Sequence, residues 1–66
     1  MIPIRLEVYL KRHKNVMLDV QSDAYMDWFH SELSDVELGK QLFVGHGKCM
    51  EDAIIDVTNK IPVDEI

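Results

Sequence analysis

The chain is poor in cysteine, proline and glycine: it has one cysteine, two prolines and three glycines in 66 residues. A single cysteine, Cys49, excludes a disulfide within the chain and fits a reducing compartment, so we expect a cytoplasmic protein. No apolar run approaches the roughly 18 residues that a membrane-spanning helix needs. The start of the chain also lacks the pattern of a secretory signal, and we therefore expect no membrane partner.

The short length limits both domain count and stability. We expect residues 1–66 to form one small domain, because the chain is 47% hydrophobic, which is enough for a folded core. A chain of this size buries only about 60% of the surface that its unfolded form exposes. Its stability would therefore be marginal, and a partner or a second copy in a homodimer would add to it.

Positive charge is scarce beyond the first fourteen residues. The chain has seven Lys and Arg against twelve Asp and Glu, a net charge of −5. Four of the seven bases lie in residues 1–14 with a single acid, whereas residues 15–66 hold three lysines and eleven acids. An acidic body repels nucleic acid and anionic lipid. The uneven distribution defines a small basic surface and a larger acidic one.

Alternating apolar residues predict a β-hairpin at the start of the chain. The alternation runs from Ile2 to Leu10 and resumes from Val16 to Val20, with the polar segment 11–15 between. Pro3 lacks a backbone donor and suits the beginning of a strand or an edge. The basic residues would then form the tip of this hairpin.

The next segment predicts a helix over residues 23–33. Ser22 or Asp23 can cap its first turn, and Phe29 and Leu33 share one apolar face. Trp28 falls on the flank of that helix.

Residues 34–44 fit two structures. Ser34 and Glu37 form a capping box, which favours a helix, whereas apolar residues alternate from Val36 to Val44, which favours a strand. We prefer a strand centred on residues 41–44, because a two-stranded hairpin is barely stable alone.

The last helix has the clearest pattern in the chain. Its apolar residues follow helical spacing along one continuous stripe, made of Met50, Ala53, Ile54, Val57 and Ile61. The expected order is β-β-α-β-α. We therefore predict an α+β fold in which a small antiparallel sheet, the N-terminal hairpin plus a third strand, carries two helices on one face.

Catalytic and metal sites have little support in the sequence. His46 and Cys49 lie three residues apart at the start of the last helix, but no family signature surrounds the cysteine. A domain of this size can hardly enclose a pocket of about 300 Å³. A structural zinc site needs a second ligand pair, which is not evident. We predict no enzyme, no cofactor and no metal site, and whether His46 and Cys49 bind a metal stays open.

The segment from Gly45 into the last helix resembles part of two small families. In double-stranded-RNA-binding domains a G-x-G-x-S-K-K-x-A motif opens the last helix, and in HicB-type antitoxin domains a glycine-bearing loop precedes a helix. The matching residues are Gly45, Gly47 and Ala53. Met50 and Glu51 replace the paired lysines of the RNA-binding family, so its RNA contacts are not implied. The helix expected between the second and third strands departs from both families, and the resemblance implies a fold alone.

The acidic surface is the larger candidate for binding. It consists of two apolar residues that lie off the apolar faces of the two expected helices and of three carboxylates of the last helix, namely Trp28, Ile55, Glu51, Asp52 and Asp56. Spaced carboxylates can imitate a phosphate backbone, and Trp is enriched where interfaces gain most of their energy. We predict a small acidic, non-enzymatic protein-interaction module. It would be an inhibitor or adaptor, of the phage or mobile-element type, that binds a nucleic-acid-handling protein.

The basic segment gives the alternative function. Lys11, Arg12 and Lys14 could contact phosphates. The protein would then be a small, antitoxin-like regulator that binds nucleic acid as a dimer.

Overall fold

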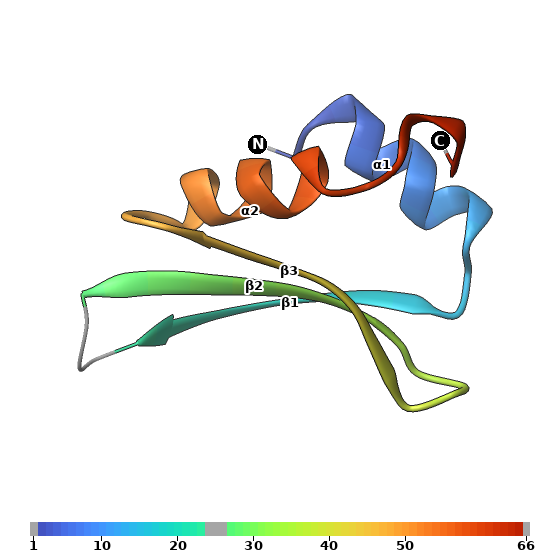
Figure 1. Cartoon of the computed structure of the whole chain (residues 1–66), viewed down its shortest axis with the longest axis horizontal. Helices are drawn as coiled ribbons and strands as arrows, with labels where there is room; N and C mark the ends of the chain where they lie inside the picture. The colour runs from blue at the N-terminus through green and yellow to red at the C-terminus, as the bar shows by residue number, and fades with distance from the viewer. Residues whose placement is uncertain (1, 24–26, 66) are drawn as a thin grey trace.

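The computed structural model describes residues 2–23 and 27–65. Its elements follow the order α1 (Ile4–Arg12), β1 (Val16–Asp23), β2 (Trp28–Asp35), β3 (Lys40–Gly47), α2 (Met50–Asn59) and the short 3-10 helix η1 (Val63–Glu65). The strands form one antiparallel sheet in the order β1-β2-β3, and both helices cover the same face of it (Figure 1). The predicted α+β class, three-stranded sheet and pair of helices are confirmed. The third strand and the last helix also lie where the sequence placed them.

The first segment is a helix, and the prediction of a hairpin strand there is wrong. Leu6 and Tyr9, three residues apart, are buried, whereas Ile4 is 77% exposed. The buried side chains therefore follow the period of a helix and not the alternation of a strand. Lys11 and Arg12 lie in the last turn of α1, where basic residues complement the helix dipole. The basic segment ends a helix, and the hairpin tip expected there does not form.

The segment 23–33, predicted as a helix, is largely strand β2. Its buried residues Ser31 and Leu33 are two apart, and the residues between and beside them are partly exposed. β2 is the central strand and pairs along both of its edges, and this pairing overrides the helical spacing of Phe29 and Leu33. Residues 24–26 of the expected helix lie outside the described residues.

A small apolar core lies between the helices and the sheet. Its buried side chains come from both helices, the central strand and the segment that follows α2, namely Leu6, Tyr9, Leu33, Val57 and Ile61. The Tyr9 ring meets Phe43 of β3 edge-on, with ring centroids 6.3 Å apart. These contacts fix α1 and α2 against one face of the sheet.

Two glycines let α2 approach β3 closely. A Cβ on Gly45 would overlap the backbone nitrogen of Val57 and lie 2.7 Å from the carbonyl oxygen of Ala53. A Cβ on Gly47 would lie 2.5 Å from the backbone nitrogen of Ala53. Ser31, opposite Gly45 in the sheet, is fully buried, and its Oγ donates a 2.6 Å hydrogen bond to the Ala53 carbonyl. The glycines are therefore required by helix packing.

Candidate functional site

One face of the sheet carries neither helix, and we call it the open face (Figure 1). The strand register defines its members. They are the alternate residues of β1 from Met17 to Asp23, those of β2 from Trp28 to Ser34, and the facing residues of β3, Gln41, Val44 and His46. Residues in between point to the helices and the core.

The open face is acidic. Asp19 of β1 lies directly opposite Glu32 of β2, and Asp23 continues the same row along β1. The three described strands contain a single Lys or Arg, Lys40, which is the first residue of β3 and lies opposite Asp35 at the end of the sheet. Asp19 and Glu32 therefore have no Lys or Arg beside them on the described strands, and their negative potential attracts cationic groups.

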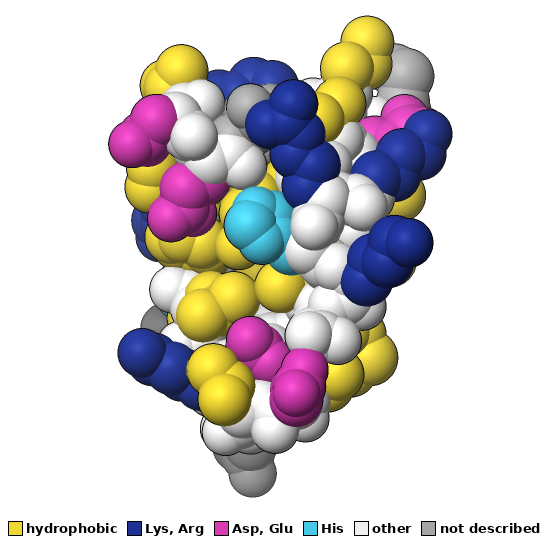
Figure 2. Space-filling view, turned by 90° about the vertical axis from the view of Figure 1, so that its right-hand side faces the viewer, with side chains coloured by type: hydrophobic (Ala, Val, Ile, Leu, Met, Phe, Trp, Pro, Cys, Tyr) yellow, Lys and Arg dark blue, Asp and Glu magenta, His cyan; other side chains and the backbone are white. Residues whose placement is uncertain are grey.

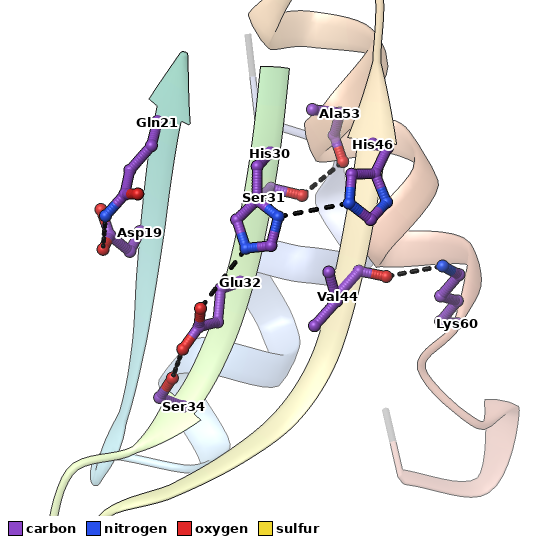
Figure 3. Close-up of polar contacts among 10 residues, drawn as sticks. All are labelled: Asp19, Gln21, His30, Ser31, Glu32, Ser34, Val44, His46, Ala53 and Lys60. Carbon is purple, nitrogen blue, oxygen red and sulfur yellow. Dashed lines mark hydrogen bonds and ion pairs between the residues drawn. The ribbon is translucent and has the colours of Figure 1, made fainter. Parts of the chain in front are cut away.

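Hydrogen bonds join four polar side chains in a row across the open face (Figure 3). His46 Nε2 lies 3.3 Å from His30 Nδ1, and His30 Nε2 lies 3.4 Å from Glu32 Oε2. Ser34 Oγ donates a 2.7 Å hydrogen bond to Glu32 Oε1. The Ser34 hydrogen bond and the weaker one from His30 lower the pKa of Glu32 below its ordinary value. The row thus joins an ionised carboxylate, held by Ser34, to two imidazoles.

Sequence reasoning did not place His30 and Glu32 together on one surface. On the expected helix these two residues would have pointed in different directions, so they did not form a pattern. The signal that could have found them is the period of two in this segment, in which Trp28, His30 and Glu32 alternate with Phe29, Ser31 and Leu33.

A depression of about 310 Å³ lies beside the two histidines. Asp23, Trp28, Phe29, His30 and His46 line it. The Trp28 side chain is 42% exposed and stands at the end of the face where β2 begins. The open face therefore combines an exposed aromatic, a hollow and paired imidazoles.

The predicted acidic surface is divided by the sheet. Glu51, Asp52 and Ile55 lie exposed on α2, which packs on the covered face, whereas Trp28 lies on the open face. The structure does not bring Trp28 together with the helical residues. What remains on α2 is a short acidic segment beside Ile55, which is 42% exposed.

Asp56, the fifth of the predicted residues, covers the free edge of β3. Its Oδ2 accepts a 2.9 Å hydrogen bond from the backbone N–H of His46 and lies 3.5 Å from Lys60 Nζ. Lys60 Nζ in turn donates to the Val44 carbonyl at 2.6 Å. The backbone hydrogen bond, with a smaller contribution from Lys60, lowers the pKa of Asp56. These contacts hinder β3 from pairing with a strand of another chain.

The basic residues lie on the helical side of the sheet. Lys11, Arg12 and Lys14 are exposed where α1 ends, and Lys11 Nζ lies 3.4 Å from Glu7 Oε1. Figure 2 looks at this end of the molecule, where the Lys and Arg side chains gather mainly in the upper right part. The structure brings the three residues of the predicted basic surface together at the end of α1, and not at the hairpin tip that the sequence predicted.

No family model, no curated protein and no solved structure matches the chain. The helix that the sequence placed before the third strand is not formed, because its residues from Trp28 onward belong to β2, and a turn joins β2 to β3. Among residues 2–23 and 27–65, no group of three or more His, Cys, Asp or Glu side chains is arranged to hold a metal ion. No helix within those residues is long and apolar enough to cross a membrane.

Proposed function

We propose that the protein is a small non-enzymatic interaction module that binds another protein through the open face of its sheet. The observation that carries the proposal is the unequal covering of the sheet. Both helices lie on one face, and the other face is acidic and exposes Trp28. The partner would present a basic surface, such as the one with which a nucleic-acid-handling protein contacts phosphates. The protein would then act as an inhibitor or adaptor of that partner.

The charge pattern of the open face supports binding more than stability. Asp19 and Glu32 are a directly opposed pair of like charges, and such pairs destabilise a sheet. Each carboxylate is nevertheless held in place by a neighbour. Gln21 Nε2 donates to Asp19 at 3.1 Å, and Ser34 Oγ donates to Glu32. Fixed carboxylates on paired strands offer a rigid acceptor array to Lys and Arg side chains.

Trp28 supplies the apolar part of this surface. Interfaces usually combine such an aromatic anchor with a polar rim, and Trp is among the residues that contribute most when buried by a partner. The depression beside Trp28 gives a partner side chain a place to insert. An aromatic anchor next to carboxylates fits a partner with Arg side chains, which both pair with carboxylates and stack on aromatic rings.

The proposal is tested by capture from a nuclease-treated lysate of the organism that encodes the protein. An Asp19→Asn/Glu32→Gln variant should lose the proteins that the wild type retains. A Glu51→Gln/Asp52→Asn variant removes the same charge from α2 and should retain them. Added duplex DNA should displace the retained proteins if they bind through a nucleic-acid-binding surface. Loss with the α2 variant and retention with the open-face variant would contradict the proposal and favour the helical surface.

A second function, binding of nucleic acid, is favoured by the exposed basic residues at the end of α1. Lys11, Arg12 and Lys14 would contact phosphates, and binding would strengthen steeply as the salt concentration falls. A gel shift with duplex and single-stranded DNA and RNA at low salt tests it, with Lys11→Gln/Arg12→Gln as the variant. Absence of a shift at micromolar protein would exclude this function.

A further inference from the structure

The two histidines of the open face are placed as a pair of metal ligands. His30 and His46 lie directly opposite each other on β2 and β3. His30 Nδ1 and His46 Nε2 are 3.3 Å apart, and the rings are inclined at 71° with centroids 5.0 Å apart. Two imidazole nitrogens bound to one tetrahedral zinc ion, each at about 2.05 Å, are separated by about 3.3–3.4 Å. The spacing of the pair already matches that of two zinc ligands.

Glu32 provides the outer contact that metal-binding histidines usually have. Its Oε2 lies 3.4 Å from His30 Nε2, the nitrogen that does not face His46. When the proton on Nε2 is donated to the carboxylate, Nδ1 is the nitrogen that accepts the hydrogen bond from His46 Nε2, and a metal ion would replace the proton shared between these two nitrogens. The Ser34 hydroxyl holds the other Glu32 oxygen at 2.7 Å. The row of hydrogen bonds therefore favours the tautomer of His30 that a metal ion requires.

The surroundings favour a cation with open coordination positions. Asp23 lines the same depression as the two histidines, and Asp19 and Glu32 add negative charge to the face. Because no third His, Cys, Asp or Glu completes a cluster among the described residues, water would fill the remaining positions. Neutral imidazole suits zinc and other late transition metals and is a poor ligand for magnesium or calcium.

We propose that His30 Nδ1 and His46 Nε2 bind one exchangeable zinc ion on the open face, with Glu32 as the positioning residue for His30. This site differs from the His46 and Cys49 pair suggested by sequence spacing. It does not depend on the proposed protein partner, because it is formed within one chain.

The test titrates zinc chloride into the metal-free full-length chain by calorimetry, with the imidazole resonances followed by NMR. We expect one ion per chain and selective shifts of the His30 and His46 rings. His30→Gln and His46→Gln should each weaken binding at least about tenfold, and Glu32→Gln should weaken it less. His13→Gln is the matched control, because His13 lies at the end of α1, and it should bind as the wild type does. Circular dichroism confirms that each variant is folded.

Cys49→Ser separates the two possible sites, since Cys49 is exposed and free. The proposal expects this variant to bind zinc as the wild type does. Binding that is lost in Cys49→Ser and kept in His30→Gln would overturn the proposal in favour of His46 and Cys49. Absence of binding to the wild type at millimolar zinc, or unchanged His30 resonances, would overturn it as well.

Discussion

The two faces of the sheet differ in what their side chains do. On the covered face, Leu33 and Ser31 are fully buried, and Gly45 leaves room for the backbone of α2. On the open face, His30 and Glu32 of the same strand are partly exposed and hydrogen bonded to each other. β2 is therefore one strand with two chemically distinct sides. Stability comes mainly from the covered side, and the open side is free to carry charge, aromatic surface and imidazoles.

The comparison also explains why an acidic, partly repulsive arrangement is tolerated. The opposed Asp19 and Glu32 weaken the β1–β2 pair only modestly, because exposed charges are screened by water and salt. The same pair on the covered face would cost several kcal/mol, on the order of what burial of unpaired charge costs. Placing the carboxylates on the open face keeps the core intact.

The largest expected effect comes from closing the space that Gly45 leaves on the covered face. In Gly45→Ala the new Cβ would overlap the Val57 backbone nitrogen, which belongs to α2 and has no freedom to move. We expect a loss of about 3 kcal/mol or more from a total unfolding free energy of about 5 kcal/mol. Urea unfolding followed by circular dichroism measures it. Gly39→Asn, at φ 64° in the β2–β3 turn with no atom within 4 Å of a Cβ, should cost less than about 1 kcal/mol and serves as the control.

A pair of truncations in β2 compares the two faces directly. Leu33→Ala removes a fully buried side chain and should lower the unfolding free energy by about 3 kcal/mol. Trp28→Ala removes a larger side chain but one that is 42% exposed, and it should cost about 1 kcal/mol. The same urea titration measures both. Equal losses for the two variants would contradict the division of β2 into a stabilising and a free side.

The hydrogen bond from Ser31 to α2 should contribute less than the apolar core. Ser31→Ala leaves the Ala53 carbonyl without its 2.6 Å hydroxyl partner, and we expect a loss of about 1 kcal/mol. Ser34→Ala removes a hydroxyl of the same type from the open face and should cost less than about 0.5 kcal/mol. Thermal melting of the two variants side by side is sufficient to distinguish them.

The smallest expected effect is a dependence on acid through Asp56. The backbone N–H of His46 lowers the pKa of Asp56 below its ordinary value of 3.8, so the ionised carboxylate stabilises the fold above that pH. This contribution is lost as the pH falls through the lower pKa of the folded protein. Wild type should therefore lose more stability than Asp56→Asn between about pH 4 and pH 2. Parallel losses in urea unfolding at each pH would show that Asp56 does not support the edge of β3.

The sequence predicted the class of the fold and the C-terminal half, and the reasons are local. The apolar stripe of α2 has a single period, and the turn before β3 restricts where that strand can begin. The N-terminal helix was not predicted, because Ile2 to Leu10 satisfies both an alternating and a helical pattern, and only packing against Val57 and Leu33 selects the helix. A sheet covered by helices on one face was predicted, but the residues of its open face were not. Those residues share a face only once β2 is known to be a strand.

Of the residues on the open face, only Trp28 was among those predicted to bind a partner. Trp28 and the acidic residues of α2 were chosen by residue type, and the sheet that separates them is a tertiary feature. Asp56 was expected to face a partner, and it binds the backbone of His46. No local pattern reveals that a carboxylate reaches across to a neighbouring strand.

The central claim, that the open face is the interaction surface, is tested most directly by two variants with equal starting exposure. Trp28 on the open face and Ile55 on α2 are both 42% exposed. Capture from the same nuclease-treated lysate should fail for Trp28→Ala and succeed for Ile55→Ala, with both variants folded. Retention by Trp28→Ala together with loss by Ile55→Ala would contradict the account and assign the interaction to the helical side.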